Sequence, residues 1–484
     1  MEMRSRVITG FVGAGTKQSL TELSLAEASD AIHSGQVTSE ALTKAMLERI
    51  QLIDSKVNAY ITVSGEDALA QARSLDIEQK NGKLRGRLHG IPIALKDNID
   101  TAGIPTTAAS NVYRERIPKE DAEVARRLKT AGAVLLGKLN LHEFAAGGTG
   151  HVSAFATTHN PWDLDRVTGG SSSGSGGALA ADLCYGALGT DTGGSIRIPS
   201  SWCGTVGLKP TYGLVSIRGI VPLMASLDHC GPMTRRVKDA AIILNVLAGY
   251  DPQDAASVPH ATEDYAAALA QPTEDIRLGT PMEFYAELDP EVSDAMKVAL
   301  NVLGQLTAGI VSDENLPPCG DLMPFLAETV AYHEAYLAQT PERYQSDTQQ
   351  FLAAAALPSA AEYIRTKNRL FALRQSIDAA FKSFDLVVLP TERILPFTIA
   401  ESEEASARAA KTGTMAPEQW ITVANTYQFN LYGLPALSLP CGFSKSGLPI
   451  GMTIAGPRFS EGKILALGAA YEAATEWHLR RPTL

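Results

Sequence analysis

A glycine- and serine-rich segment in the first half of this chain lies between stretches that resemble packed elements. Nine of the 26 residues from 169 to 194 are glycine, and serines occupy positions 171, 172, 173 and 175. In isolation such a string is typical of a flexible linker. Here an apolar helical stretch, 178–183, and a strand-like run, 185–189, follow it and lead to a second glycine turn. We therefore expect the glycines to let the backbone turn with positive φ and approach a ligand closely.

The segments around it alternate between helix and strand patterns. Helices are predicted from Ser24, where a capping box stands, over 39–53 and over 121–130. Short apolar runs predict strands at 91–95, 134–136, 276–279, 386–389, 436–439 and 450–455. This order predicts an α/β fold with a mixed, twisted central sheet and helices on both faces. We expect one domain over 1–484, with an N-terminal helical part at about 20–75, a core at about 85–250, a peripheral helical insert at about 281–425 and C-terminal strands with a helix at about 426–484.

The net charge and the cysteine content argue against several classes of function. The net charge of −11 argues against nucleic-acid and anionic-membrane partners, because both need basic surfaces. Five scattered cysteines without a CxxC pair predict neither a zinc site nor a disulfide framework, and favour a reducing cytoplasm. The short apolar run 7–14 contains two glycines, so we do not expect a signal peptide, and no apolar run reaches membrane-spanning length.

The turn that ends at Ser195 favours nucleophilic catalysis. Consecutive glycine amides before a serine can aim their N–H groups at one point, as an oxyanion hole requires. A serine hydroxyl is a weak nucleophile and needs a base beside it. No histidine lies in the glycine segment; His89, His142, His151 and His159 lie upstream, and the residues alone leave them open as bases.

Several long motifs together resemble the amidase signature family. They are 169–175, 189–199 and 203–211 around the glycine turns, 88–98 at a predicted strand, 227–233, and the pair 433–437 and 447–451 near the C-terminus. They occur in the family's order and cover most of the chain apart from about 281–425. The resemblance implies a Ser-Ser-Lys catalytic triad in place of a Ser-His-Asp triad.

The resemblance also assigns roles by position. Ser195 is implied as the nucleophile, Ser171 as the bridging serine after a cis Gly170–Ser171 bond, and Lys96 as the base. The implied oxyanion hole comprises the backbone N–H groups of Thr192, Gly193, Gly194 and Ser195. Supporting roles are implied for Ser172, Asp191 and Arg197.

Lys96 can act as a base only when it is neutral. Its pKa must then lie well below the usual value of about 10.4, which a dry, buried environment would achieve. Asp97 follows directly and would raise that pKa. We therefore expect the Asp97 side chain to face the opposite side of the strand.

The implied activity is hydrolysis of a C–N amide bond through an acyl-enzyme, without a metal or organic cofactor. We expect a small neutral amide or carbamate with an aryl or apolar group, because the later part of the chain supplies candidates for an aromatic pocket. These are Phe325, Tyr332, Tyr336, Phe371 and Phe429.

Three alternatives stay open: an ester or carbamate hydrolase, the A subunit of a glutamine-dependent tRNA amidotransferase, and a non-catalytic binding protein. The amidotransferase would need an arginine for the glutamine carboxylate, and Arg365, Arg369 and Arg374 are candidates. A tyrosine-rich helix motif expected for it between about 320 and 380 is absent. A homo-oligomer is also left open.

Overall fold

The structure is a computed structural model that describes residues 19–353, 357–412 and 420–484. The apolar run 7–14 lies outside these residues. Within them, no helix combines the length and the apolar character needed to cross a bilayer.

A mixed sheet of 11 strands forms the centre of the described structure, in the order β1-β3-β2-β6-β8-β7-β12-β13-β11-β9-β10. Strand β2 is parallel to both β3 and β6, and β9 is parallel to both β10 and β11; the other pairs are antiparallel. A separate two-stranded sheet pairs β4 with β5. The strands are β1 Tyr60–Val63, β2 Pro92–Lys96, β3 Val134–Leu139, β4 His159–Asn160, β5 Asp163–Val167, β6 Gly186–Asp191, β7 Val206–Lys209, β8 His229–Thr234, β9 Leu278–Gly279, β10 Ile310–Ser312, β11 Leu386–Pro390, β12 Ala436–Phe443 and β13 Pro449–Ala455.

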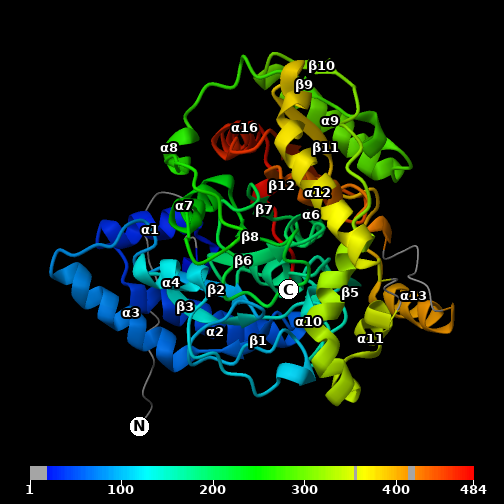
Figure 1. Ribbon diagram of the computed structural model, residues 1–484. Helices are drawn as coiled ribbons and strands as arrows, with labels where there is room; N and C mark the ends of the chain where they lie inside the picture. Colours follow the sequence, from blue (N-terminus) through cyan, green and yellow to red (C-terminus); the bar gives the residue numbers. More distant parts are fainter. Residues whose placement is uncertain (1–18, 354–356, 413–419) are drawn as a thin grey trace, which may run out of the picture.

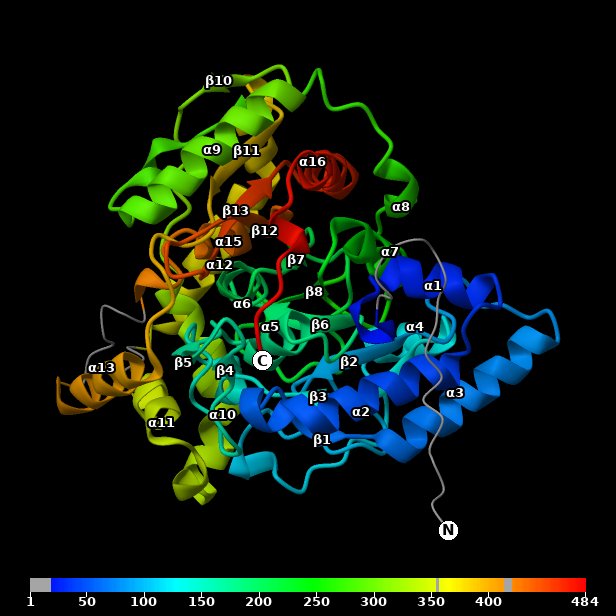
Figure 2. The ribbon, with the colours of Figure 1, turned by 180° about the vertical axis from the view of Figure 1, so that it is seen from behind.

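Two groups of helices pack on this sheet. Helix α5 contacts both α2 and α6, whereas α7, α16 and α9 form a second connected group (Figures 1 and 2). The predicted α/β fold with flanking helices is confirmed. The helices are α1 Leu25–His33, α2 Ser39–Val57, α3 Gly65–Lys80, α4 Glu123–Thr130, α5 Ser173–Ala180, α6 Arg197–Cys203, α7 Val237–Leu247, α8 Tyr265–Ala268, α9 Pro290–Leu306, α10 Leu326–Gln339, α11 Ser346–Ala353, α12 Ala360–Ser376, α13 Ile399–Thr412, α15 Tyr427–Tyr432 and α16 Glu461–Ala474.

The described residues between 281 and 425 are mostly helical, and they also extend the sheet. Helices α10, α11, α12 and α13 lie together at one side of the molecule (Figure 1). Strands β10 and β11 belong to the same range and pair with β9 near one edge of the central sheet. The insert is therefore joined to the core by strand pairing as well as by helix packing.

Gly169 and Gly194 have the positive φ that was expected of this segment, whereas the glycines of helix α5 have a different use. Gly174, Gly176 and Gly177 lie inside helix α5 and have no positive φ. A Cβ on Gly174 would overlap the Ala59 carbonyl oxygen, and one on Gly176 would lie 3.1 Å from the Pro199 side chain. These glycines therefore permit close packing of a buried helix against neighbouring segments, and not approach to a ligand.

Candidate active site

Lys96 is the last residue of β2 and is completely buried. Its Nζ lies 2.7 Å from the Ser171 Oγ and 2.8 Å from the Thr190 Oγ1. Thr190 belongs to the neighbouring parallel strand β6, so the pairing of β2 with β6 brings this hydroxyl to the lysine. The amine is thus held between two hydroxyl groups in the interior of the protein.

Burial lowers the pKa of Lys96 to about 7, although the carboxylates of Asp191 and Asp228 act in the opposite direction. Asp97 does not contact the amine. Its carboxylate accepts hydrogen bonds from the Thr107 backbone N–H at 2.9 Å and the Thr107 hydroxyl at 2.5 Å, and lies 3.2 Å from the Lys138 Nζ. The expectation that Asp97 faces away is confirmed.

Ser171 and Ser195 come from adjacent turns that are bonded to one another. The Gly170–Ser171 peptide is cis, and the next amide, of Ser172, donates to the Ser195 carbonyl oxygen at 3.2 Å. The Ser172 hydroxyl also lies 3.3 Å from the Thr190 carbonyl oxygen at the end of β6. Ser171 is fully buried beside Lys96, whereas Ser195 is 8% exposed and lines a pocket. Through its backbone N–H, Ser172 therefore connects the segment that carries Ser171 to the turn that carries Ser195.

The backbone amides at the Ser195 turn divide into two groups. Gly194 N–H donates to the Asp191 Oδ1 at 2.8 Å, and is therefore already satisfied. Within the described part of the chain, the N–H groups of Thr192, Gly193 and Ser195 have no protein acceptor. Three of the four amides expected in an oxyanion hole are thus free to donate to a ligand, and Gly194 instead stabilises the turn.

A buried ion pair holds this turn in place. The Arg197 guanidinium binds the Asp191 carboxylate through Nε at 3.0 Å and Nη2 at 2.9 Å, and both residues are fully buried. Asp191 also accepts from the Ile196 N–H and from the Asn430 Nδ2 at 2.8 Å. Burial alone would raise the pKa of Asp191, but Arg197 and these hydrogen bonds hold it well below its usual range. Asp191 is therefore a charged anchor for the turn that carries Ser195.

We expect Arg197→Met to lower the free energy of unfolding by about 3–5 kcal/mol, because it leaves a buried carboxylate without its cation. Urea titration followed by circular dichroism measures the change. Lys44→Met serves as the control, since Lys44 pairs with Glu48 at a surface where both side chains are more than half exposed, and it should leave stability nearly unchanged. Equal stability of the two variants would contradict the anchoring role of Arg197.

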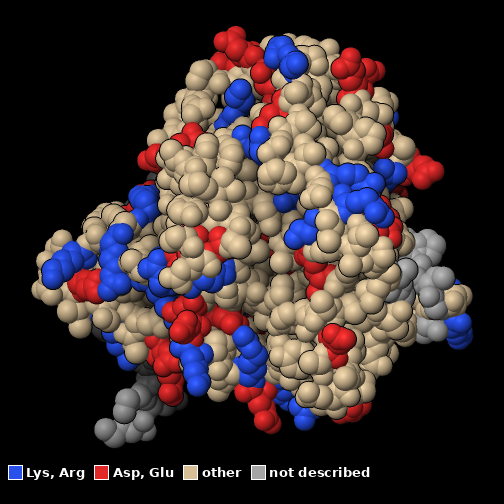
Figure 3. Space-filling model, viewed as in Figure 1, with Lys and Arg blue, Asp and Glu red and all other residues tan. Residues whose placement is uncertain are grey.

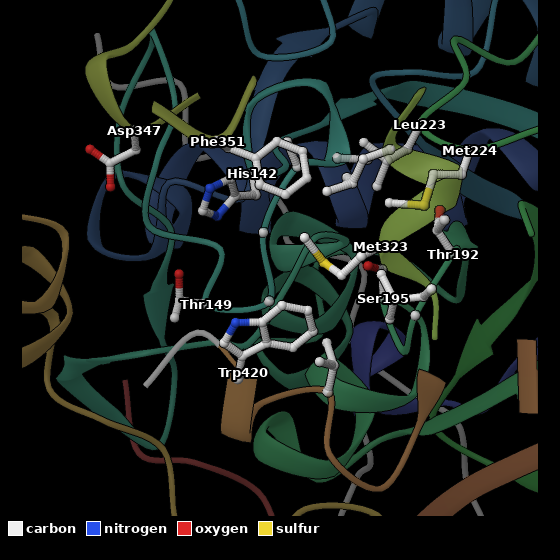
Figure 4. Close-up of a pocket in the computed structure, with 18 of the residues that line it drawn as sticks. His142, Thr149, Thr192, Ser195, Leu223, Met224, Met323, Asp347, Phe351 and Trp420 are labelled. Carbon is white, nitrogen blue, oxygen red and sulfur yellow. The ribbon is translucent and has the colours of Figure 1, made fainter. Parts of the chain in front are cut away.

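Ser195 opens into a cavity of about 280 Å³ (Figure 4). Most of its described lining is apolar, and none of it is lysine or arginine. One wall comes from the core: His142, Ala145, Ala146, Gly147, Gly148, Thr149, Thr192, Gly193, Ser195, Leu223 and Met224. The other comes from the insert: Leu322, Met323, Leu326, Asp347, Gln350, Phe351, Ala353, Ala409, Trp420 and Val423.

The aromatic residues that the sequence offered as candidates for this pocket are not among its described lining. Phe325 is buried behind the pocket wall, in the same cluster as several lining residues, and Phe429 is buried in a separate cluster. Tyr332 and Tyr336 pack around Tyr113. Phe371 is 66% exposed. The prediction of an apolar, aromatic pocket holds, but Phe351 and Trp420 supply its rings, because only the packing of the insert on the core decides which side chains face Ser195.

The three candidate arginines also lie away from the pocket. Arg365 and Arg369 are exposed on α12, and the described pocket lining includes neither. Arg374 donates to the carbonyl oxygens of Leu431, Ser226 and Asn430. It therefore serves to join α12 to the core.

Of the four histidines considered as bases, His142 alone is among the described residues that line the pocket. Burial holds the pKa of His142 well below its usual range, and its Nδ1 accepts from the Gly150 N–H at 3.3 Å. His89 contacts the Leu75 carbonyl oxygen, and His159 contacts the Leu164 carbonyl oxygen. His151 contacts the Thr149 hydroxyl.

Sequence reasoning missed several residues that complete the site. Thr190 contacts Lys96, and Asn430 contacts both Asp191 and Arg197. Asp228 accepts from the Thr192 hydroxyl and from the amides of Leu223 and Met224, and so connects the Ser195 turn to the pocket wall. Thr190 and Asp228 lie within the quoted motifs and could have been inferred from them. Asn430 lies 239 residues after Asp191, and nothing in the sequence around it indicates a contact with Asp191.

No group of three or more His, Cys, Asp or Glu side chains is arranged to hold a metal ion in the described residues. On the face shown in Figure 3, basic and acidic side chains are interspersed.

Comparisons with known proteins agree with this architecture. A family profile described as Amidase matches residues 41–465. The A subunit of the glutamyl-tRNA(Gln) amidotransferase of Moorella thermoacetica is 39% identical over 487 residues, covering 95% of this chain and 98% of the relative. A solved structure of 6-aminohexanoate cyclic dimer hydrolase with substrate has a TM-score of 0.86 at 28% identity, covering 96% and 99% of the two chains. The peptide amidase of Stenotrophomonas maltophilia has a TM-score of 0.78 at 31% identity, covering 95% and 98%.

The fold and the matched length define the class of protein as a serine hydrolase that cleaves amide bonds. The chain belongs to the amidase signature family.

Proposed function

We propose that this chain, acting alone, hydrolyses the C–N bond of a small amide through Ser195, Ser171 and Lys96. The observation that carries the proposal is the 2.7 Å contact between the buried Lys96 Nζ and the Ser171 Oγ, next to the turn that places Ser195 in the pocket. With a pKa of about 7, a large fraction of Lys96 is neutral at neutral pH and able to accept a proton.

The proposed reaction has two steps. The Ser195 Oγ attacks the amide carbon while its proton passes to Ser171, whose own proton passes to the Lys96 Nζ. The oxyanion accepts hydrogen bonds from the free amides of Thr192, Gly193 and Ser195. Ser171 then returns a proton to the leaving amine as the C–N bond breaks. Water attacks the acyl-enzyme, gives its proton to the same relay, and releases a carboxylic acid and Ser195.

Ser172, Asp191 and Arg197 have positioning roles in this proposal. The Ser172 hydroxyl bonds to the Thr190 carbonyl oxygen, and the Asp191–Arg197 pair fixes the Gly194 and Ile196 amides on either side of Ser195. Their substitution should disturb the alignment of the nucleophile with the oxyanion amides. No metal or organic cofactor takes part in these steps.

The lining of the pocket supports a substrate with an aryl or apolar body and no negative charge. Phe351, Trp420 and Met323 offer apolar contact, and no lysine or arginine stands among the described lining residues. A substrate carboxylate would lose its hydration there without gaining a cation. Carbamates and esters with the same body remain alternative substrates of the same relay.

The A subunit of a glutamine-dependent tRNA amidotransferase is a second candidate, because relatives with that name are 39% identical over nearly the whole chain. That activity would require a basic partner for the glutamine carboxylate, and Arg365, Arg369 and Arg374 do not line the described pocket. We therefore favour the standalone hydrolase.

We expect the purified chain to cleave an acylanilide with a kcat/KM at least about 100-fold above that for glutamine, because burying an unpaired carboxylate is costly. Pentanamide, which has the aliphatic amide of glutamine without its charged groups, should fall between the two. Release of aniline and of ammonia measures the rates. A preference for glutamine, or activity that appears only when a second protein is added, would replace the standalone hydrolase with the amidotransferase.

Two further features support a single-domain organisation and a location in a reducing compartment. Strands from the N-terminal part, the core, the insert and the C-terminal part share one central sheet, which supports a single domain over 1–484. Cys184, Cys203, Cys230 and Cys441 are buried free thiols, which fits a reducing compartment such as the cytoplasm.

A further inference from the structure

The pocket contains a single acidic residue among its described lining, Asp347. Figure 4 shows its carboxylate at the opposite end of the pocket from Ser195, with His142 and Phe351 between the two. The proposed reaction does not use this carboxylate, so its place in the pocket needs another explanation.

Helix α11 presents Asp347 to the pocket. Asp347, Gln350 and Phe351 have the i, i+3, i+4 spacing of one helix face, and all three line the cavity. Just before the helix, the Gln345 N–H donates to the buried Glu143 carboxylate at 2.9 Å, which attaches the start of α11 to the core. The carboxylate of Asp347 therefore has a defined position in the pocket wall.

Within the described structure, neither a lysine nor an arginine pairs with the carboxylate, and its nearest basic group is the His151 ring. Its Oδ1 accepts from the Ser346 hydroxyl at 3.2 Å, whereas its Oδ2 is buried and has no hydrogen-bond donor. The His151 Nε2 lies 4.0 Å from that Oδ2. Burial lowers the pKa of His151 below its ordinary value, although Asp347 itself acts to raise it, so the ring is neutral at neutral pH.

Asp347 is the single acidic residue in the described lining of a mostly apolar cavity, and no lysine or arginine stands there to pair with it, which favours a ligand that brings a positive charge. We propose that Asp347 binds a protonated amine at the end of the substrate remote from the scissile amide. This inference rests on the proposed function and refines it: the substrate has an apolar body, a reactive amide at Ser195 and an ammonium group at Asp347.

The test compares three sets of 4-nitroanilides whose acyl chains of about four to eight carbons end in an amine, a methyl group or a carboxylate. The wild-type protein should prefer the best amine-terminated chain over its methyl-terminated match by about 10- to 100-fold in kcat/KM. The carboxylate-terminated set should be the poorest. A second series, N-(ω-aminoalkyl)benzamides against N-alkylbenzamides, covers the case in which the leaving group occupies this end of the pocket.

Asp347→Asn should remove the preference for the amine-terminated over the methyl-terminated chains, since the charged contact is lost. Glu342→Gln, which removes the same charge from an exposed residue outside the pocket, should leave the preference unchanged. An equal loss for all substrates in Asp347→Asn, or a wild-type preference for the methyl-terminated chain, would overturn the proposal.

A binding measurement tests the role of Asp347 independently of whether the proposed reaction is correct. Calorimetry with the Ser195→Ala protein should show that the amine-terminated anilide binds about 10- to 100-fold more tightly than its methyl-terminated match, and that the added Asp347→Asn substitution abolishes the difference. If that difference is found while no anilide is cleaved by the wild-type protein, the proposed reaction is wrong and the role of Asp347 stands. Absence of the difference overturns the role of Asp347 whatever is cleaved.

Discussion

Ser195→Ala is expected to abolish amide hydrolysis, with a loss of about 10⁴-fold or more, and to prevent covalent labelling by a fluorophosphonate. The physical reason is that Ser195 carries the hydroxyl that lines the pocket beside the free amides of Thr192 and Gly193, while Ser171 is buried behind it. Turnover with a chromogenic anilide and mass spectrometry of the labelled protein measure both effects.

The matched control for this substitution is Ser175→Ala. Ser175 belongs to the same serine-rich segment, but its buried hydroxyl donates to the Leu188 carbonyl oxygen, and the described pocket lining does not include it. This variant should retain labelling. Undiminished labelling of Ser195→Ala, with the protein still folded, would place the nucleophile elsewhere.

The second large effect is expected at Lys96. Lys96→Ala should lower kcat/KM for amides by about 10³-fold or more, because the Ser171–Ser195 relay then has no proton acceptor. Amides should lose more activity than esters of the same acyl group, since an amine leaving group needs the returned proton and an alkoxide or phenoxide needs it less.

The wild-type pH profile tests the protonation state. In the proposed relay Lys96 acts as the neutral amine, so kcat/KM should be low below its pKa of about 7, rise as the pH passes through that value, and level off above it. The rising limb should be absent from whatever activity Lys96→Ala retains. A wild-type profile without a rising limb near neutral pH would contradict the assignment of Lys96 as the base.

Histidine variants provide the matched comparison for Lys96. His142 lines the pocket and His89 does not, and burial holds the pKa of His142 well below its ordinary range. His89→Asn should leave activity nearly unchanged, and His142→Asn should cost much less than Lys96→Ala. A loss at either histidine that equals the loss at Lys96 would overturn the lysine assignment.

The sequence alone was enough to predict the α/β class, seven of the 13 described strands and the approximate place of several helices. Runs such as 91–95 and 386–389 are short, apolar and bounded by turn residues. This pattern predicts buried strands, and the structure has β2 and β11 there. The resemblance also singled out Lys96, Ser171 and Ser195 as a candidate triad, because they lie in long motifs that span strand ends and glycine turns. The structure brings Lys96 and Ser171 into contact and places Ser195 on the turn bonded to Ser172.

Only the tertiary structure decided what surrounds these residues. Asn430 completes the Asp191–Arg197 pair from a helix more than 200 residues away, and no local pattern marks it. The aromatic side chains of the pocket proved to be Phe351 and Trp420, because the packing of α11 and the following segments on the core determines which faces point inward. The position of Asp347 in the pocket lining was equally absent from the sequence pattern, since an acidic residue in the first turn of a helix is ordinarily solvated. The motifs along the chain thus determined which residues are proposed to react. Contacts between distant segments determined the pocket around them, because those contacts depend on the packing of the whole chain.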